Sequence, residues 1–157
     1  MKHVALLLHY YQPPTQDPDM VRRIDGECYA PSFELLARTG ARVTVNINWS
    51  LTEQLQGLDS LSLDSLRRAG GIEPTGSGAY HPILPLIPPG EVERQLKLNA
   101  SGNGSVLGEA FARPRGVFPP EMALDDPTAR LLAGLGYAWT VTDDLPWHAS
   151  GRYVPGR

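Results

Sequence analysis

Short apolar segments alternate with helix-forming segments along almost the whole chain, and this alternation limits the fold more than any other feature. The apolar or β-branched segments, which predict strands, are residues 4–8, 42–48, 72–75, 116–118 and 137–142. The segments that predict helices are residues 31–39, 62–69, 91–99 and 127–135, with a further helix from residue 50. Because parallel strands need long crossover connections, usually helices, this order predicts an α/β fold with one parallel sheet of about five strands.

The ends of the predicted helices carry their own signals. Gly40 follows the first helix, at a position where a left-handed residue commonly ends a helix. Ser50 and Glu53 have the spacing of a capping box, and Asp126 before a proline predicts an N-cap. The segment SGNGSVLG at residues 101–108 is a poor helix former, so the helix before it is expected to end there.

The composition limits the kinds of molecule that this chain is expected to bind. The formal net charge is −3 and no basic stripe is present, so no nucleic-acid partner is expected. No apolar run approaches the ~20 residues of a membrane span, so no membrane partner is expected either. Cys28 is the single cysteine, which excludes an internal disulfide and is typical of a reducing compartment. We therefore expect a cytoplasmic protein.

Polar and aromatic residues that can do chemistry stand just after the predicted strands. They are His9, Asn48, Trp49, residues 76–81, Glu121, Asp143 and Asp144. The carboxyl ends of parallel strands meet at one edge of the sheet, and that edge carries the active site in α/β folds. We therefore expect these residues to gather there, although polar residues after strands are also ordinary loop residues.

The two histidines each have a structural and a functional interpretation. His9 alone is typical of a structural histidine at a strand end, but with two tyrosines and Gln12 after it the group fits a sugar site. His81 lies between Tyr80 and Pro82, which restrict the local backbone, and it is either packed or held for a purpose. No histidines have an i, i+4 spacing and the cysteine is single, so no metal site or other cofactor is expected.

Glu121 is the strongest single candidate for chemistry. It follows a predicted strand and two prolines, whose rigid backbone would hold a carboxylate in place. An acidic residue near a helix start can instead simply stabilise the helix dipole. Asp143 and Asp144 have the same two interpretations, as a loop or capping pair or as part of the site.

Four segments of the sequence form a specific combination of motifs. They are HYYQPP at residues 9–14, GECYAP at 26–31, TGSGAYHPILPLIP at 75–88 and GVFPPEMALD at 116–125. Together they resemble the amylase-like branch of glycoside hydrolase family 57. The resemblance implies a retaining mechanism on α-glucans inside an incomplete barrel of seven βα units, with Glu121 as the nucleophile. The residues we expect to contact the substrate are His9, Gln12, Trp49, Tyr80, His81, Asp143 and Asp144.

The sequence departs from the family pattern mainly because it is too short to include all of the family's motifs. Phe118 stands where the family often has Trp, and the acid/base aspartate of the family lies in a later motif. Residues 1–157 are therefore expected to form the N-terminal portion of a catalytic barrel, with barrel surface exposed for self-association. The leading hypothesis is a glycosidase or glucanotransferase acting on α-glucans. The alternatives are a metal-dependent polysaccharide deacetylase, which shares this barrel type, and a non-catalytic, truncated sugar-binding fragment.

Overall fold

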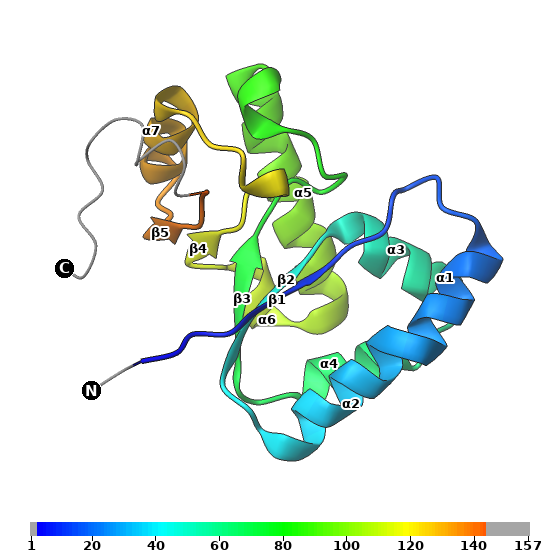
Figure 1. Ribbon diagram of the computed structural model, residues 1–157. Helices are drawn as coiled ribbons and strands as arrows, with labels where there is room; N and C mark the ends of the chain where they lie inside the picture. The colour runs from blue at the N-terminus through cyan, green and yellow to red at the C-terminus, as the bar shows by residue number, and fades with distance from the viewer. Residues whose placement is uncertain (1–2, 144–157) are drawn as a thin grey trace.

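The computed structural model describes residues 3–143, which form one parallel sheet with helices between the strands (Figure 1). The strands are β1 (Leu7–Tyr10), β2 (Val43–Ile47), β3 (Ile72–Gly76), β4 (Gly116–Val117) and β5 (Trp139–Thr140). The α-helices are α1 (Pro18–Ile24), α2 (Ala30–Thr39), α3 (Trp49–Gly57), α4 (Ser62–Arg68), α5 (Pro89–Leu107), α6 (Glu109–Ala112) and α7 (Asp126–Gly134). A π-helical turn is η1 (Asp25–Tyr29), and the 3₁₀ turns are η2 (Leu84–Leu86) and η3 (Pro120–Met122). No helix within residues 3–143 is both long and apolar enough to cross a membrane.

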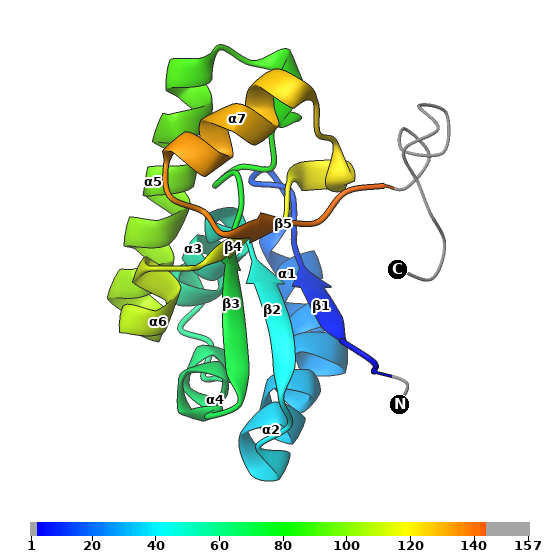
Figure 2. The same ribbon diagram turned by 90° about the vertical axis from the view of Figure 1, so that its left-hand side faces the viewer.

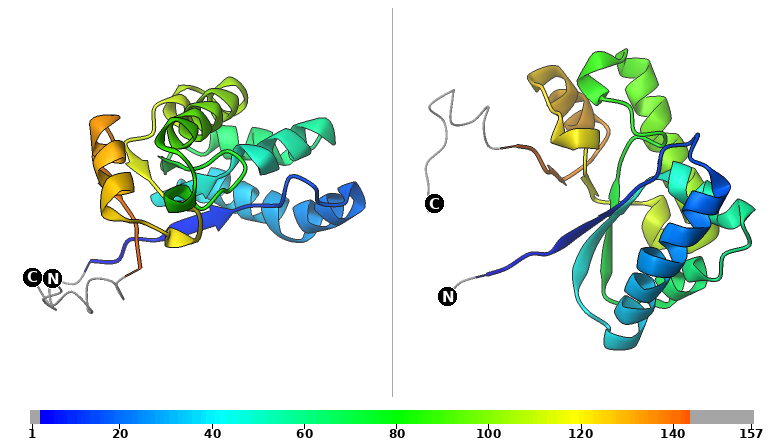
Figure 3. Two further views of the ribbon diagram at one scale, coloured as in Figure 1. Left: turned by 90° about the horizontal axis from the view of Figure 1, so that it is seen from above. Right: turned by 45° about the vertical axis from the view of Figure 1, so that its right-hand side comes forward.

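The strands lie in sequence order, β1-β2-β3-β4-β5, and every neighbouring pair is parallel. This confirms the predicted α/β class and the expected number of strands. Because crossovers between parallel strands are right-handed, a chain that always moves on to the next strand keeps its helices on one side and curls the sheet toward a barrel. Figure 2 shows the strands side by side, and Figure 3 shows the helices arranged around them.

Alternate residues of β2 face opposite sides of the sheet. Val43, Val45 and Ile47 are buried against the helices in one hydrophobic core together with Phe33. Asn46 points to the other side, and it is nevertheless fully buried. A central strand buried on both faces is typical of a parallel sheet. The core on one face therefore leaves the opposite face to carry polar side chains.

The segment after β1 is more helical than the sequence predicts. A helix is expected from Pro31, but α1, η1 and α2 run without interruption through residues 18–39. Asp17 caps α1 by accepting hydrogen bonds from two backbone N–H groups of its first turn. At the other end Gly40 has φ of 60°, so its predicted place after the helix is confirmed.

The start of α3 is held by tertiary contacts, and the predicted capping box is absent. Asn48 stands at the N-cap position and makes no capping hydrogen bond through its side chain. The Ser50 hydroxyl donates to the carbonyl of Gln12 at 3.0 Å, and Glu53 accepts from the Tyr80 hydroxyl at 3.2 Å. The capping-box prediction is wrong because both side chains bind partners outside the helix.

Helix α5 continues through the glycine-rich segment where the sequence predicts its end. A Cβ at Gly102 would overlap the ring of Trp49, which belongs to α3. A Cβ at Gly104 would likewise overlap Ala112 of α6. The close approach of these helices requires glycine at both positions, and the packing it allows outweighs the low helix propensity of glycine.

Buried amide side chains tie α5 to the carboxyl end of the sheet. Asn99 accepts a hydrogen bond of 2.8 Å from the backbone N–H of Trp49, at the start of α3. Asn103 donates one of 2.9 Å to the carbonyl of Ile47, at the end of β2. Since buried polar groups need partners, these bonds fix α5 relative to the edge where β2 ends.

Helix α7 is capped one residue earlier than the sequence predicts. Asp125 is the N-cap residue, and its carboxylate accepts a hydrogen bond of 2.8 Å from the backbone N–H of Thr128. The hydrogen bonds from Thr128, through its side chain and its backbone, hold the pKa of Asp125 below its ordinary value. Asp126 is instead the first helical residue and pairs with Arg130 on the surface at 3.3 Å.

Candidate active site

A row of neighbouring positions crosses the sheet near the carboxyl ends of the strands. His9 on β1 is in register with Asn46 on β2, and Asn46 donates a hydrogen bond of 2.9 Å to Thr75 on β3. Thr75 is in register with Gly116 on β4, which is itself in register with Trp139 on β5. Position 116 has to be glycine, because a Cβ there would overlap the Trp139 ring. These five residues form the floor of the candidate site.

His9 lies inside β1, because the strand occupies Leu7–Tyr10 and not the predicted residues 4–8. Its Nδ1 is 2.6 Å from Oδ1 of Asn46. Its ring stacks on Phe118 and on His81, with centroid distances of 5.0 and 5.4 Å. Burial lowers the pKa of His9, and the nearby His81 lowers it further, against an opposing contribution from the hydrogen bond to Asn46. His9 is therefore held mainly as a neutral imidazole near neutral pH.

His81 connects this floor to Glu121. Its φ is 60°, an uncommon value for a residue with a side chain, and its N–H donates to the carbonyl of Gly78 at 3.2 Å. Its ring stacks on Tyr11 with a centroid distance of 3.9 Å. Its Nε2 donates to Oε1 of Glu121 at 3.0 Å. Its Nδ1 is buried and has no hydrogen-bond partner among the described residues.

Glu121 belongs to a tight turn in which two consecutive residues have left-handed backbones. The φ values are 58° at Glu121 and 54° at Met122. The N–H of Met122 donates to the carbonyl of Pro119 at 2.9 Å, and the Thr142 hydroxyl donates to the carbonyl of Met122 at 3.2 Å. The Glu121 side chain is 70% exposed. It lies in η3 and not in the first turn of α7, so the helix-start interpretation does not describe its position.

Three of the predicted substrate contacts make side-chain contacts with the helical segments, and within residues 3–143 none of the three forms a side-chain hydrogen bond with His81 or Glu121. Gln12 donates a hydrogen bond of 2.7 Å to the Tyr29 hydroxyl. Trp49 begins α3, and its ring lies against Gly102 of α5. Tyr80 precedes His81 and turns its hydroxyl toward a glutamate of α3. All three side chains are therefore held by contacts with helical segments, namely η1, α5 and α3.

Two of the predicted residues fall at the end of the described range, and two site residues have no counterpart in the sequence prediction. Asp143 is exposed and is the last residue described, while Asp144 lies outside the described residues. Asn46 and Phe118 both contact His9 and were not among the expected site residues. An asparagine between two β-branched strand residues is the signal that points to Asn46. Tyr11, which the sequence groups with His9, has its pKa raised by burial and by Glu121.

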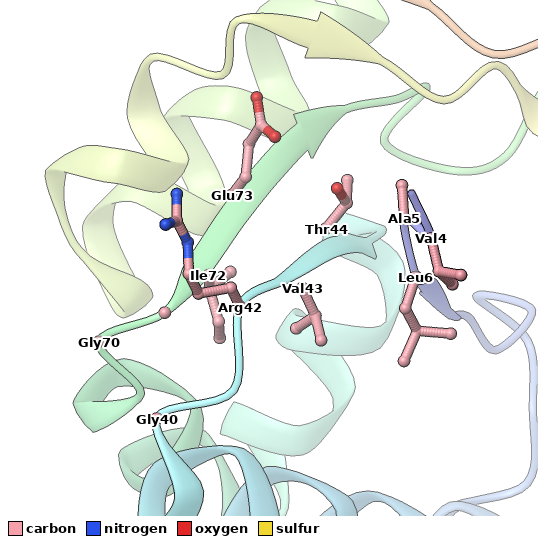
Figure 4. A pocket seen from close by; sticks show the side chains of 11 residues that line it. Val4, Ala5, Leu6, Gly40, Arg42, Val43, Thr44, Gly70, Ile72 and Glu73 are labelled. Atoms are coloured by element: carbon pink, nitrogen blue, oxygen red, sulfur yellow. The ribbon is translucent and has the colours of Figure 1, made fainter. Parts of the chain in front are cut away.

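A separate hollow of about 780 Å³ opens at the amino end of the sheet (Figure 4). It is lined by the segment before β1 and by the starts of β2 and β3, with Arg42 and Glu73 as its charged lining residues. Val4 and Leu6 line it from the β1 side and are 95% and 54% exposed. The hollow contains neither histidine nor Glu121, so it is not part of the candidate site.

Known proteins with similar sequences and folds include enzymes of α-glucan metabolism. An α-amylase of Pyrococcus horikoshii is 26% identical over 148 residues, a match covering 92% of this chain and 23% of the amylase. The crystal structure of a 4-α-glucanotransferase from Thermococcus litoralis matches with a TM-score of 0.79 and 22% identity, covering 89% of this chain and 22% of that chain. A Streptococcus pyogenes deacetylase in complex with acetate matches with a TM-score of 0.57 and 16% identity, covering 85% of this chain and 80% of that chain. The chain thus spans less than a quarter of the amylase and of the glucanotransferase.

The family match covers the candidate site. The model for glycosyl hydrolase family 57 matches residues 9–155, which is nearly the whole chain. The matched region begins at His9 and includes His81 and Glu121. This chain therefore belongs to glycosyl hydrolase family 57.

Proposed function

We propose that this chain supplies the nucleophile side of an active site that hydrolyses or transfers α-glucans with retention of configuration. The observation that carries the proposal is the position of Glu121, whose carboxylate accepts a hydrogen bond from His81 at the carboxyl edge of the sheet. Retaining glycosidases need a carboxylate held beside the anomeric carbon. Membership of family 57 and the similarity to an α-amylase support the choice of α-glucans as substrate class.

In the proposed mechanism, one oxygen of Glu121 attacks the anomeric carbon while the glycosidic bond breaks. The bonding electrons pass to the leaving oxygen, which takes a proton from a second carboxyl group about 5–5.5 Å from the first. The hydrogen bond from His81 occupies Oε1 and leaves Oε2 as the attacking atom. Water then releases the sugar in hydrolysis, or a sugar hydroxyl accepts it in transfer.

The proton donor is proposed to lie outside residues 3–143. On this proposal, residues 1–157 form the N-terminal portion of a catalytic barrel, consistent with their share of less than a quarter of the amylase and glucanotransferase lengths. We expect no measurable turnover by the 157-residue chain alone. Turnover that survives repurification would show that a local carboxyl group, such as that of Asp143, supplies the proton.

Aromatic faces beside hydrogen-bonding groups support the proposed sugar contacts. The rings of His9, Tyr11 and His81 stack with centroid distances between 3.9 and 6.2 Å, and this aromatic cluster lies beside Glu121, which is hydrogen-bonded to His81. The residues proposed to bind the glucan are His9, Gln12, Trp49, Tyr80, His81, Asp143 and Asp144. Of these, His81 is hydrogen-bonded to Glu121, and His9 stacks on His81.

The role of Glu121 is tested by Glu121→Gln in a complete protein that contains this segment. The amide keeps the size of the side chain but cannot form a glycosyl ester, so turnover should be abolished while glucan binding stays largely intact. In Glu121→Ala, whose shorter side chain leaves space for an anion, added azide should restore some rate and give a glycosyl azide of inverted configuration. Glu109→Gln is the matched control, because Glu109 is an exposed acid at a helix start and lies away from the site. Near-normal turnover in Glu121→Gln would show that Glu121 is not the nucleophile.

The deacetylase alternative rests on the fold alone. The deacetylase structure is 16% identical to this chain. Within residues 3–143, no group of three or more His, Cys, Asp and Glu side chains is arranged to hold a metal ion. Metal analysis of the purified protein separates the two functions, since a deacetylase of this type needs a bound metal. A non-catalytic sugar-binding fragment predicts glucan binding that Glu121→Gln leaves unchanged and no turnover in any longer form.

The exposed segment just before β1 supports self-association. Val4 and Leu6 are apolar, exposed and beside the hollow at the amino end of the sheet (Figure 4). We propose that a second copy of the chain covers this surface, since exposed apolar patches beside an open strand edge tend to find a partner. The exposed thiol of Cys28 supports a cytoplasmic location, where free thiols stay reduced.

A further inference from the structure

A row of polar side chains links the first three strands beneath the candidate site, exposed at His9 and buried at Asn46 and Thr75. Asn46 lies in the middle of β2 between Val45 and Ile47 and is 0% exposed. Its amide is paired on both sides: Oδ1 is 2.6 Å from Nδ1 of His9, and Nδ2 donates to Thr75 at 2.9 Å. The register places His9 directly beside Asn46 on the neighbouring strand. The three side chains therefore form a continuous hydrogen-bonded row, in which both ends of the Asn46 amide are bonded.

The direction of these bonds fixes where the proton of His9 resides. The nitrogen of the Asn46 amide donates to Thr75, so its oxygen faces His9, and an amide oxygen can only accept. Nδ1 of His9 therefore carries the proton, and a neutral imidazole then has its lone pair on Nε2. Within residues 3–143 the hydrogen bonding of the His9 side chain runs through Nδ1, which leaves Nε2 available to a ligand.

We infer that Asn46 is a positioning residue, which fixes His9 in the Nδ1–H tautomer so that Nε2 accepts a hydrogen bond from a sugar hydroxyl. His81 has the opposite arrangement, because its Nε2–H donates to Glu121. One histidine thus presents an acceptor to the site and the other uses the same ring atom as a donor. The identity of the ligand as a sugar rests on the proposed function, whereas the tautomer of His9 does not.

The tautomer is measured directly on the 157-residue chain by nitrogen-15 NMR of the histidine rings. The His9 signals are assigned by their loss in His9→Gln. Near neutral pH we expect a protonated Nδ1 and an unprotonated Nε2. A protonated Nε2, or a rapid mixture of both tautomers, would overturn the inference. This measurement needs no other variant to fold.

The role of Asn46 is isolated by comparing Asn46→Ala with Asn48→Ala. Asn48 is equally buried, and its side chain donates to the carbonyl of Gly78 at 2.6 Å without contacting His9. Asn46→Ala should turn the single tautomer of His9 into a mixture, and Asn48→Ala should leave it single. Asn46→Asp keeps an acceptor in place, so it should retain the tautomer and raise the pKa of His9. A single Nδ1–H tautomer in Asn46→Ala would show that Asn46 does not determine it.

Titration with maltotriose, a short α-glucan, tests the ligand separately. Weak binding suffices, because fast exchange moves the averaged signal. We expect the Nε2 signal of His9 to shift in the wild-type chain and to shift less in Asn46→Ala. A correct tautomer with no response to maltotriose would contradict the sugar contact and the proposed function at this residue, while the positioning of His9 by Asn46 would stand.

Discussion

The imidazole of His81 and the carboxylate of Glu121 meet at 3.0 Å through two residues that both have left-handed backbones, with φ of 60° and 58°. The two residues are 40 positions apart, on the loops that follow β3 and β4. Backbone of this kind persists only where the surrounding structure imposes it, and such residues cluster at functional sites. The position of the carboxylate therefore depends on two strained loops and not on one flexible side chain.

The first prediction separates backbone strain from side-chain chemistry at position 81. His81→Asn should unfold at a higher urea concentration than His81→Val, with a difference of about 1–2 kcal/mol in the free energy of unfolding. Asparagine tolerates the left-handed region, whereas a β-branched residue is an outlier there. Both variants lose the ring and its stacking on Tyr11, so loss of the ring does not contribute to the difference between them. Equal stabilities would mean that the left-handed backbone at this position costs nothing.

The second prediction concerns the pH dependence of stability through His9. Its pKa in the folded chain is lowered from 6.5, mainly by burial, so the unfolded chain binds the proton more tightly. The contribution of a neutral His9 is present above 6.5 and is lost as the pH falls through the lower, folded-state pKa. His81, which lowers this pKa, and Glu121, which opposes the lowering, both act on His9.

The corresponding measurement is urea unfolding at several pH values for the wild type and His9→Gln. The wild type should lose more stability than the variant as the solution is acidified below 6.5. Taking the difference between the two proteins removes the titration of the other groups that they share. A difference that is constant with pH, or that grows in favour of the wild type in acid, would contradict the lowered pKa.

The third prediction tests why α5 contains glycine. Gly102→Ala should destabilise the chain by about 1–3 kcal/mol, because the new methyl group would overlap the Trp49 ring. Gly90→Ala in the same helix meets no atom within 4 Å, so it should be neutral or stabilising by up to about 1 kcal/mol. In a Trp49→Ala background the cost of Gly102→Ala should shrink or reverse, since the overlapping ring is gone. Thermal and urea unfolding of the four variants give the comparison.

The fourth prediction assigns the cap of α7. Asp125→Ala should cost about 1 kcal/mol of stability, because the N–H of Thr128 loses its acceptor. Asp126→Ala should cost less, because it removes only an exposed ion pair with Arg130. The loss in Asp125→Ala should also diminish in strong acid, where the lowered pKa of Asp125 no longer keeps it ionised. A larger loss of stability in Asp126→Ala would show that Asp126 is the N-cap residue, as the sequence predicts.

The fifth prediction concerns association through the segment just before β1. Leu6→Lys should shift the chain toward the monomer in light scattering, because a charge at an exposed strand edge opposes pairing with another copy. Leu61→Lys is the control, since Leu61 is 79% exposed before α4 and does not line the hollow of Figure 4. A monodisperse wild-type monomer would contradict the proposed self-association before any variant is needed.

The sequence by itself determined the architecture. Apolar strand segments that alternate with helical segments pack as a parallel sheet with crossover helices, and the protein has this fold. The same reasoning brought His9, His81 and Glu121 to one edge, because parallel strands all end there. Gly40 was predicted correctly, since a local left-handed residue ends a helix whatever surrounds it.

The tertiary structure decided the features in which distant residues meet. Local propensity ends α5 before Gly102, but packing against Trp49 favours a continuous helix, and packing is not encoded within one window of sequence. Local spacing gives Ser50 a capping role, but a carbonyl 38 residues away accepts its hydrogen bond instead. Asn46 becomes a partner of His9 only once β1 and β2 are in register. Each outcome depends on contacts across the sheet, which the folded chain alone brings together.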